Sequence, residues 1–286
     1  MLIAVSAALL GLCVGSFLNV VIYRLPIMLD RQWRRQAEET LNPEAVPPAS
    51  EPFDLVRPRS ACPSCRVPIR PWHNIPVVGW LLLGGKCADC RQPIPVRYPL
   101  VEAFTGLITL VVVAHFGLTV ECAAALGLSW SLIALAGIDL DHQILPDIIT
   151  LPLTWIGLLV AVVGEVRGGF TTLSDPVSGI IGAIAGYLSL WSVYQLFRLV
   201  TGKEGMGYGD FKLLAALGAW LGWQMLPAVV LLSACVGAVL GILMIVVRGR
   251  DRQMPIPFGP YLAGAGFVAL LWGQSLVDSY RRLSGI

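Results

Sequence analysis

The most regular feature of the chain is a succession of long apolar runs separated by shorter polar stretches. A helix needs about 20 apolar residues to cross a hydrocarbon core of roughly 30 Å, and runs of about this length recur along the sequence. The predicted spans are 2–23, 99–116, 121–138, 148–165, 177–198, 211–223, 226–247 and 258–276. The pattern predicts an all-α polytopic membrane protein with about eight transmembrane helices, or seven if the short run 211–223 does not cross.

Composition and charge agree with this interpretation. Of the 286 residues, 56% are hydrophobic and only 13% are charged, far from the average of soluble domains. If the N-terminus lies outside, 17 of the 20 Lys and Arg fall in cytoplasmic segments, which are 24–98, 139–147, 198–212 and 248–257. Lys and Arg favour cytoplasmic loops, so the large loop is predicted to face the cytoplasm. The first run lacks the basic start of a signal peptide and is predicted to be a retained span.

Three parts follow from this pattern: a first transmembrane helix (1–23), a polar loop (24–98) and a membrane domain (99–286). Within the loop, residues 27–58 are charged and contain several prolines, which predicts a short amphipathic helix or an extended linker. Residues 59–98 surround four cysteines and are predicted to form a compact module.

The four cysteines form two CxxC pairs separated by 21 residues, namely Cys62 with Cys65 and Cys87 with Cys90. This spacing is typical of a four-thiolate zinc site, which has no open coordination position and is therefore structural. Metal binding would supply folding free energy to a module too small to hold a core unaided. The alternatives are a redox pair and two coincidental pairs. His73, between the pairs, is either a further ligand or an exposed loop residue.

Acidic side chains at the ends of apolar runs are the candidate catalytic groups, because carboxylates at membrane depth are costly and usually functional. Asp139 ends an uninterrupted apolar run, and Asp210 follows Gly207 and Gly209 at the start of another. The predicted topology puts both acids at the cytoplasmic end of their helices. Two carboxylates from different helices can share a proton and activate a water, which is the chemistry of aspartyl proteolysis.

Three further acids have two interpretations each. Asp141 and Asp147 are either structural residues or supporting residues that contact substrate or tune the catalytic pair, Asp147 being placed to favour a helix N-terminus. Glu102, just inside the second span, is either a partner of Arg97 or a substrate contact.

The chain resembles the type IV prepilin peptidase family along essentially its whole length. The matching segments, in order, are 15–26 (Gly-Ser-Phe-Leu-Asn-Val-Val-Ile-Tyr-Arg-Leu-Pro), the two CxxC pairs, Trp72-His-Asn-Ile-Pro76, Arg97-Tyr-Pro-Leu-Val-Glu102, Asp139-Leu-Asp-His-Gln-Ile-Leu-Pro-Asp147 and 202–212, which contains Gly207-Tyr-Gly-Asp210. One departure is His73, where many relatives carry an acidic residue.

The resemblance implies a bifunctional enzyme of the bacterial inner membrane. It would cleave the leaders of type IV prepilins and pseudopilins after a glycine on the cytoplasmic side, with Asp139 and Asp210 as the catalytic pair. It would then N-methylate the new terminus with S-adenosylmethionine, using the loop that carries the cysteines. Methyl transfer rests on the resemblance alone, because the glycines at 205–209 follow no predicted strand.

Two alternatives are a peptidase without methyl transfer and a transporter in which the aspartates relay protons. Both acids lie at one face, whereas transporter sites tend to lie at the midplane between inverted repeats. A third alternative is an assembly scaffold, which would not need either acid. The expected partners are prepilins and the lipid bilayer, with no nucleic acid.

Overall fold

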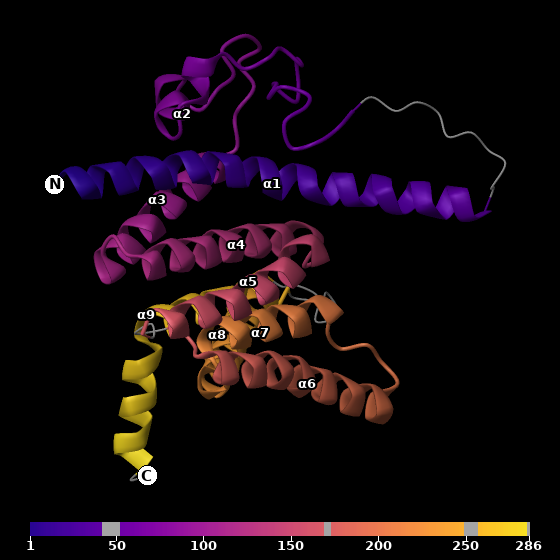
Figure 1. The fold of residues 1–286 in the computed structure, drawn as a ribbon. Helices are drawn as coiled ribbons and strands as arrows, with labels where there is room; N and C mark the ends of the chain where they lie inside the picture. The colour runs from indigo at the N-terminus through magenta and orange to yellow at the C-terminus, as the bar shows by residue number, and fades with distance from the viewer. Residues whose placement is uncertain (42–51, 169–172, 249–256, 285–286) are drawn as a thin grey trace. The chain divides into compact units, whose positions relative to one another are not determined.

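The structure is a computed structural model that describes residues 1–41, 52–168, 173–248 and 257–284 (Figure 1). The chain divides into two compact units, Met1–Ala114 and His115–Ile286. The helices are α1 (Leu2–Leu41), η1 (Pro71–Asn74), α2 (Val78–Leu82), α3 (Arg97–Phe116), α4 (Val120–His142), α5 (Asp147–Val166), α6 (Pro176–Thr201), α7 (Tyr208–Leu221), η2 (Trp223–Met225), α8 (Leu226–Arg248) and α9 (Gly259–Ser284). Among the described residues there is no strand beyond two isolated bridges, so the all-α prediction is confirmed.

Each predicted span coincides with a helix. A helix crosses a membrane only if it is also long and apolar enough. Six segments are long and apolar enough to do so within the described residues: α1, α3, α4, α5, α6 and Trp223–Met244. Helix α7 has 14 residues and is about 21 Å long at 1.5 Å per residue, shorter than the hydrocarbon core. The count of eight spans stays a prediction.

Residues 27–41 were expected to belong to a short helix or a linker, but they continue α1. It runs for 40 residues and passes through Pro26, so no separate short helix or linker begins at residue 27. The extension is rich in good helix formers and carries an ion pair one turn apart, between Arg34 Nε and Asp30 Oδ2 at 2.9 Å, a spacing that supports helices. The rest of the predicted linker, residues 42–51, lies outside the described residues.

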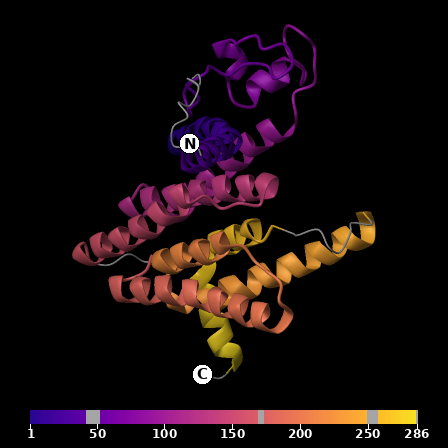
Figure 2. The ribbon, with the colours of Figure 1, turned by 90° about the vertical axis from the view of Figure 1, so that its right-hand side faces the viewer.

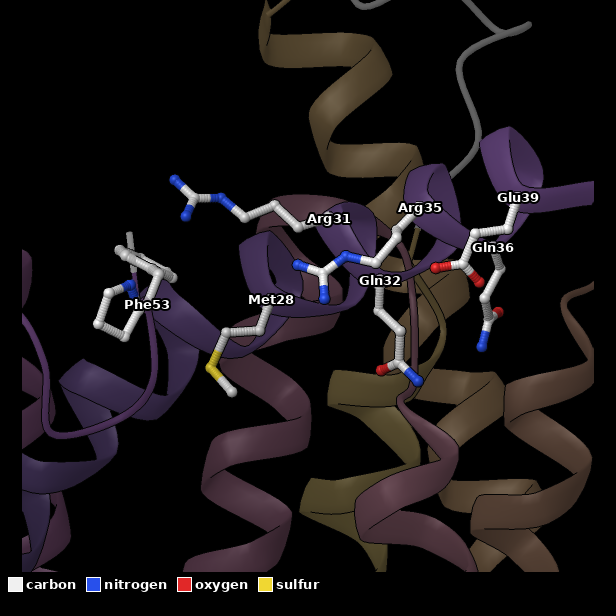
Figure 3. A pocket seen from close by; sticks show the side chains of 8 residues that line it. Met28, Arg31, Gln32, Arg35, Gln36, Glu39 and Phe53 are labelled. Carbon is white, nitrogen blue, oxygen red and sulfur yellow. The ribbon is translucent and has the colours of Figure 1, made fainter. Parts of the chain in front are cut away.

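Residues 52–58 pack back onto α1. The guanidinium of Arg24 donates to the carbonyl oxygens of Asp54 (2.9 Å) and Pro58 (2.6 Å), and that of Arg31 lies 4.3 Å from the centre of the Phe53 ring. A hollow of about 630 Å³ runs beside this contact (Figure 3). It is lined by Met28, Arg31, Gln32, Arg35, Gln36, Glu39, Pro52 and Phe53.

Small residues bring α1 and α3 into close contact in the first unit. A Cβ at Gly11 would lie 2.6 Å from Thr109 Oγ1, and one at Gly15 would lie 2.7 Å from the Cα of Glu102. Such close approach is how helices commonly pack in membranes. One turn further along α1, the amide of Asn19 donates to the carbonyl of Tyr98 at 3.0 Å.

Helix α7 is the centre of the second unit, where it contacts α5, α6 and α9 (Figure 2). Nearly all of its side chains are buried. Gly182 of α6 and Gly218 of α7 meet backbone to backbone, leaving no room for a Cβ on either. The indole of Trp220 donates to the carbonyl of Leu153 on α5 at 2.8 Å. Neighbouring helices thus shield this short helix and hold the residues at its N-terminus in place.

Candidate active site and metal centre

Asp139 lies in the last turn of α4 and is 5% exposed. The apolar residues before it form the buried face of the helix. The chain turns directly afterwards, because Gln143 adopts a left-handed conformation and its N–H donates to the Asp139 carbonyl at 2.9 Å. The Asp139 carboxylate is therefore held at a helix end, next to the loop that leads into α5.

Asp210 lies in the first turn of α7 and is 7% exposed. The structure brings it close enough to Asp139 for the charges of the two carboxyls to interact. Two acids that are 71 residues apart in the sequence thus form one buried pair at the ends of α4 and α7.

Gly259 is the site residue that sequence reasoning missed. Its backbone N–H donates to Asp139 Oδ2 at 3.0 Å, and a Cβ at this position would lie 2.7 Å from the same oxygen. Only a glycine allows this approach. The available signal was the Pro257-Phe258-Gly259-Pro260 segment, in which prolines and a glycine interrupt the chain just before the last apolar run.

Two helix N-termini therefore meet the acid pair, that of α7 at Asp210 and that of α9 at Asp139. Helix N-termini favour negative charge, whereas burial and a neighbouring carboxylate disfavour it. These opposing effects suit a pair that carries one negative charge and one proton. Such a pair can supply both a general acid and a general base.

Two glycines, Gly207 and Gly209, precede Asp210, and packing requires a glycine only at position 209. A Cβ there would lie 2.7 Å from the Cβ of Leu145, in the loop after α4. Gly207 precedes α7 with an extended backbone, and a Cβ there would meet only Asp210 Oδ2, at 3.7 Å. Gly209 thus lets the start of α7 approach the end of α4, which brings the two acids together.

Asp141 and Asp147, the two acids that follow Asp139 in the sequence, do not join the buried pair. Asp141 is exposed. Asp147 begins α5, and both its carboxylate oxygens accept from Lys212 Nζ, at 2.6 and 2.7 Å. The Lys212 side chain in this ion pair is 25% exposed. Asp147 thus links the start of α5 to α7.

The four predicted metal ligands come together in the first unit. The Sγ atoms of Cys62, Cys65, Cys87 and Cys90 all lie within 4.8 Å of one another, and those of Cys62 and Cys90 are 3.7 Å apart. A tetrahedral zinc with Zn–S bonds of about 2.3 Å requires sulfurs about 3.8 Å apart. The cluster therefore fits such an ion.

Both CxxC pairs use the same backbone turn. The residue after each pair has a positive φ, 59° at Arg66 and 61° at Arg91, and its N–H donates back to the carbonyl of Cys62 or Cys87. The backbone N–H groups of Cys65 and Ser64 lower the pKa of the Cys62 thiol to about 6. The first turn thus favours the thiolate of Cys62, the form that binds metal, whereas desolvation and the neighbouring cysteines raise the pKa of Cys90 to about 12.

Two open questions from the sequence have structural answers. Glu102 Oε2 accepts from the backbone N–H of Val77 at 2.7 Å, an arrangement that neither earlier interpretation included. His73 is half-buried in η1, and the ligand cluster found among the described residues contains only the cysteines.

Comparison with known proteins matches both units to described families. Residues 9–116 match the bacterial peptidase A24 N-terminal domain, and residues 126–242 match the type IV leader peptidase family. A prepilin leader peptidase/N-methyltransferase of Pseudomonas aeruginosa is 54% identical over 277 residues, covering 97% of this chain and 93% of the relative. One of Neisseria gonorrhoeae is 48% identical over 270 residues, covering 94% and 91%. No solved structure matches the chain. The chain belongs to the type IV leader peptidase family.

Proposed function

We propose that this protein is a membrane aspartyl endopeptidase that removes the leader of type IV prepilins and pseudopilins and then N-methylates the new N-terminus. The single observation that carries the peptidase part is the buried pair of Asp139 and Asp210 with the N–H of Gly259 on one carboxylate. The names of the relatives support both activities.

The pair would cleave a peptide bond by acid–base chemistry. The ionised acid takes a proton from the attacking water while the protonated acid donates a hydrogen bond to the scissile carbonyl. Hydrogen bonding from Gly259 to Asp139 keeps that carboxylate oriented. Two neighbouring acids of this kind would titrate as one pair, so neither role would belong permanently to one residue.

Purified enzyme in detergent should convert a peptide that carries a prepilin leader ending in glycine followed by phenylalanine. Mass spectrometry should show the leader released and, when S-adenosylmethionine is added, the mature peptide heavier by one methyl group. Cleavage without methylation would support the peptidase-only alternative. No cleavage in either condition would contradict the proposal.

The cysteine cluster would hold a structural zinc ion. All four positions are filled by thiolates, so the ion would organise the loop between the first two spans and leave no position for substrate. S-adenosylmethionine would supply the methyl group, and the resemblance associates this loop with the transfer.

The enzyme would lie in the bacterial inner membrane, with the cysteine module and the acid pair at the cytoplasmic side. A reporter fused after residue 50 should therefore report the cytoplasm, and one fused after residue 167 should report the opposite side, because loop Lys and Arg set the orientation. Alkaline phosphatase and green fluorescent protein fusions measure the two sides. Cytoplasmic signals at both points would contradict this orientation.

A further inference from the structure

The segment between the two CxxC pairs exposes an unusual number of large apolar side chains. They are Trp72 (57% exposed), Ile75 (47%), Val78 (46%), Leu81 (62%) and Leu82 (77%). All belong to η1, α2 or the turn between them. Large apolar side chains exposed together on one short segment of a small module indicate a contact with a partner or with lipid.

The backbone of this segment is anchored to a transmembrane helix through a strained turn. Val77 has φ 60° and ψ −50°, and the N–H of Val78 donates to the carbonyl of Pro76 at 2.6 Å. This is a γ-turn of the rare, strained form, here centred on a β-branched residue. Such strain persists where the surroundings impose it, and here Glu102 of α3 accepts the N–H of Val77.

The hydrogen bond between Glu102 and Val77 lies within the lengths of α1 and α3 and not beyond their ends. Glu102 is five residues into α3, about 7.5 Å along the axis from Arg97. Its Cα lies against Gly15, which is nine residues, or about 14 Å, before Arg24 on α1. In the view of Figure 1, α2 lies above the N-terminal half of α1 and not beyond its end.

The backbone around the turn suits a lipid environment, in which every polar group needs a partner inside the protein. The N–H groups of Gly79, Leu81, Leu83, Gly84 and Gly85 all donate to carbonyls within the segment. The indole N–H of Trp80 donates to the carbonyl of Ile94 at 3.1 Å. For Val77, the partner is Glu102.

Charged residues border the apolar segment on both sides. Arg70 precedes η1 and Lys86 follows α2, and both are exposed. Basic residues on either side of an apolar, Trp-containing stretch are typical of segments at the interface with anionic headgroups.

We propose that residues 75–83 form a re-entrant turn that inserts into the cytoplasmic leaflet, with Ile75, Val78, Leu81 and Leu82 in contact with acyl chains. Glu102 ties the tip of this turn to α3, and the cysteine cluster joins its two ends. The cysteine module is thus held against the membrane surface and does not hang free on a cytoplasmic loop.

Photo-crosslinking in liposomes tests the contact directly. The full chain, with p-benzoylphenylalanine in place of Leu82, is reconstituted in phosphatidylethanolamine and phosphatidylglycerol and irradiated. The matched control carries the same group in place of Arg59, an exposed residue that precedes the first CxxC pair. Mass spectrometry should find several-fold more lipid adduct at position 82 than at position 59, while both proteins keep their metal.

Equal, low lipid adduct at the two positions would overturn the proposal, and so would a cross-link from position 82 to a second copy of the chain. A second pair of variants tests the anchor. Glu102→Leu, which removes the acceptor for Val77, should reduce the lipid adduct at position 82, and Glu102→Gln, which keeps an acceptor oxygen, should not. Equal adduct in the two variants would show that Glu102 does not hold the turn.

Discussion

Asp139→Asn and Asp210→Asn enzymes should each lose leader cleavage, by about 10⁴-fold or more, because an amide can neither donate the acidic proton nor accept one from water. The acids act as one pair, so the double variant should be little worse than either single variant. Cleavage of a prepilin-leader peptide, followed by mass spectrometry, gives the rates.

The matched controls are the two acids that follow Asp139 in the sequence, Asp141 and Asp147. Asp141→Asn and Asp147→Asn should keep measurable activity, since Asp141 is exposed and Asp147 is paired with Lys212. All four variants should still insert and bind metal, because the cysteines belong to the other unit. Normal cleavage by Asp139→Asn with none by Asp147→Asn would assign the catalytic role to Asp147 in place of Asp139. Normal cleavage by all four would rule out the aspartyl mechanism.

Removal of the metal should loosen the cysteine module and leave the second unit folded. The purified protein should carry about one zinc, and Cys87→Ser should lose it, because three thiolates bind the ion far more weakly than four. Structural zinc contributes about 10–16 kcal/mol of apparent binding free energy in small zinc-binding peptides, so residues 59–98 should become sensitive to proteolysis. Metal analysis and limited proteolysis measure the two effects.

Cys235→Ser is the matched control for this variant, because Cys235 is an exposed residue of α8 outside the ligand cluster. It should keep the metal and the protease resistance of the module. Metal should also dissociate as the pH falls, since protons compete for the thiolates. An unchanged zinc content in Cys87→Ser would show that these cysteines do not form one site.

The sequence was a good guide to features that are local in the chain. The length of each apolar run predicted a helix, since a backbone in lipid must bond within its own segment. The spacing of the cysteines predicted a cluster, and the structure contains one. Asp139, which ends the uninterrupted apolar run, is buried, whereas Asp141, two residues later, is exposed.

Local patterns were a poorer guide to where helices end and which short helices are buried. The charged residues and prolines of segment 27–58 suggested a short helix or a linker, but α1 continues through Pro26 to Leu41, because residues 27–41 contain good helix formers. The short run of α7 left it open whether the helix crosses, and its burial comes from α5, α6 and α9 around it.

The sequence by itself thus determined the helical membrane class, the cysteine cluster and the identity of the two buried acids. Only the tertiary structure decided what surrounds them. The N–H that reaches Asp139 comes from Gly259, 120 residues away, Lys212 is held by Asp147, and Glu102 holds Val77. The physical reason is that these contacts depend on how distant helices pack, whereas hydrophobic periodicity and motif spacing report only on residues close together in the chain.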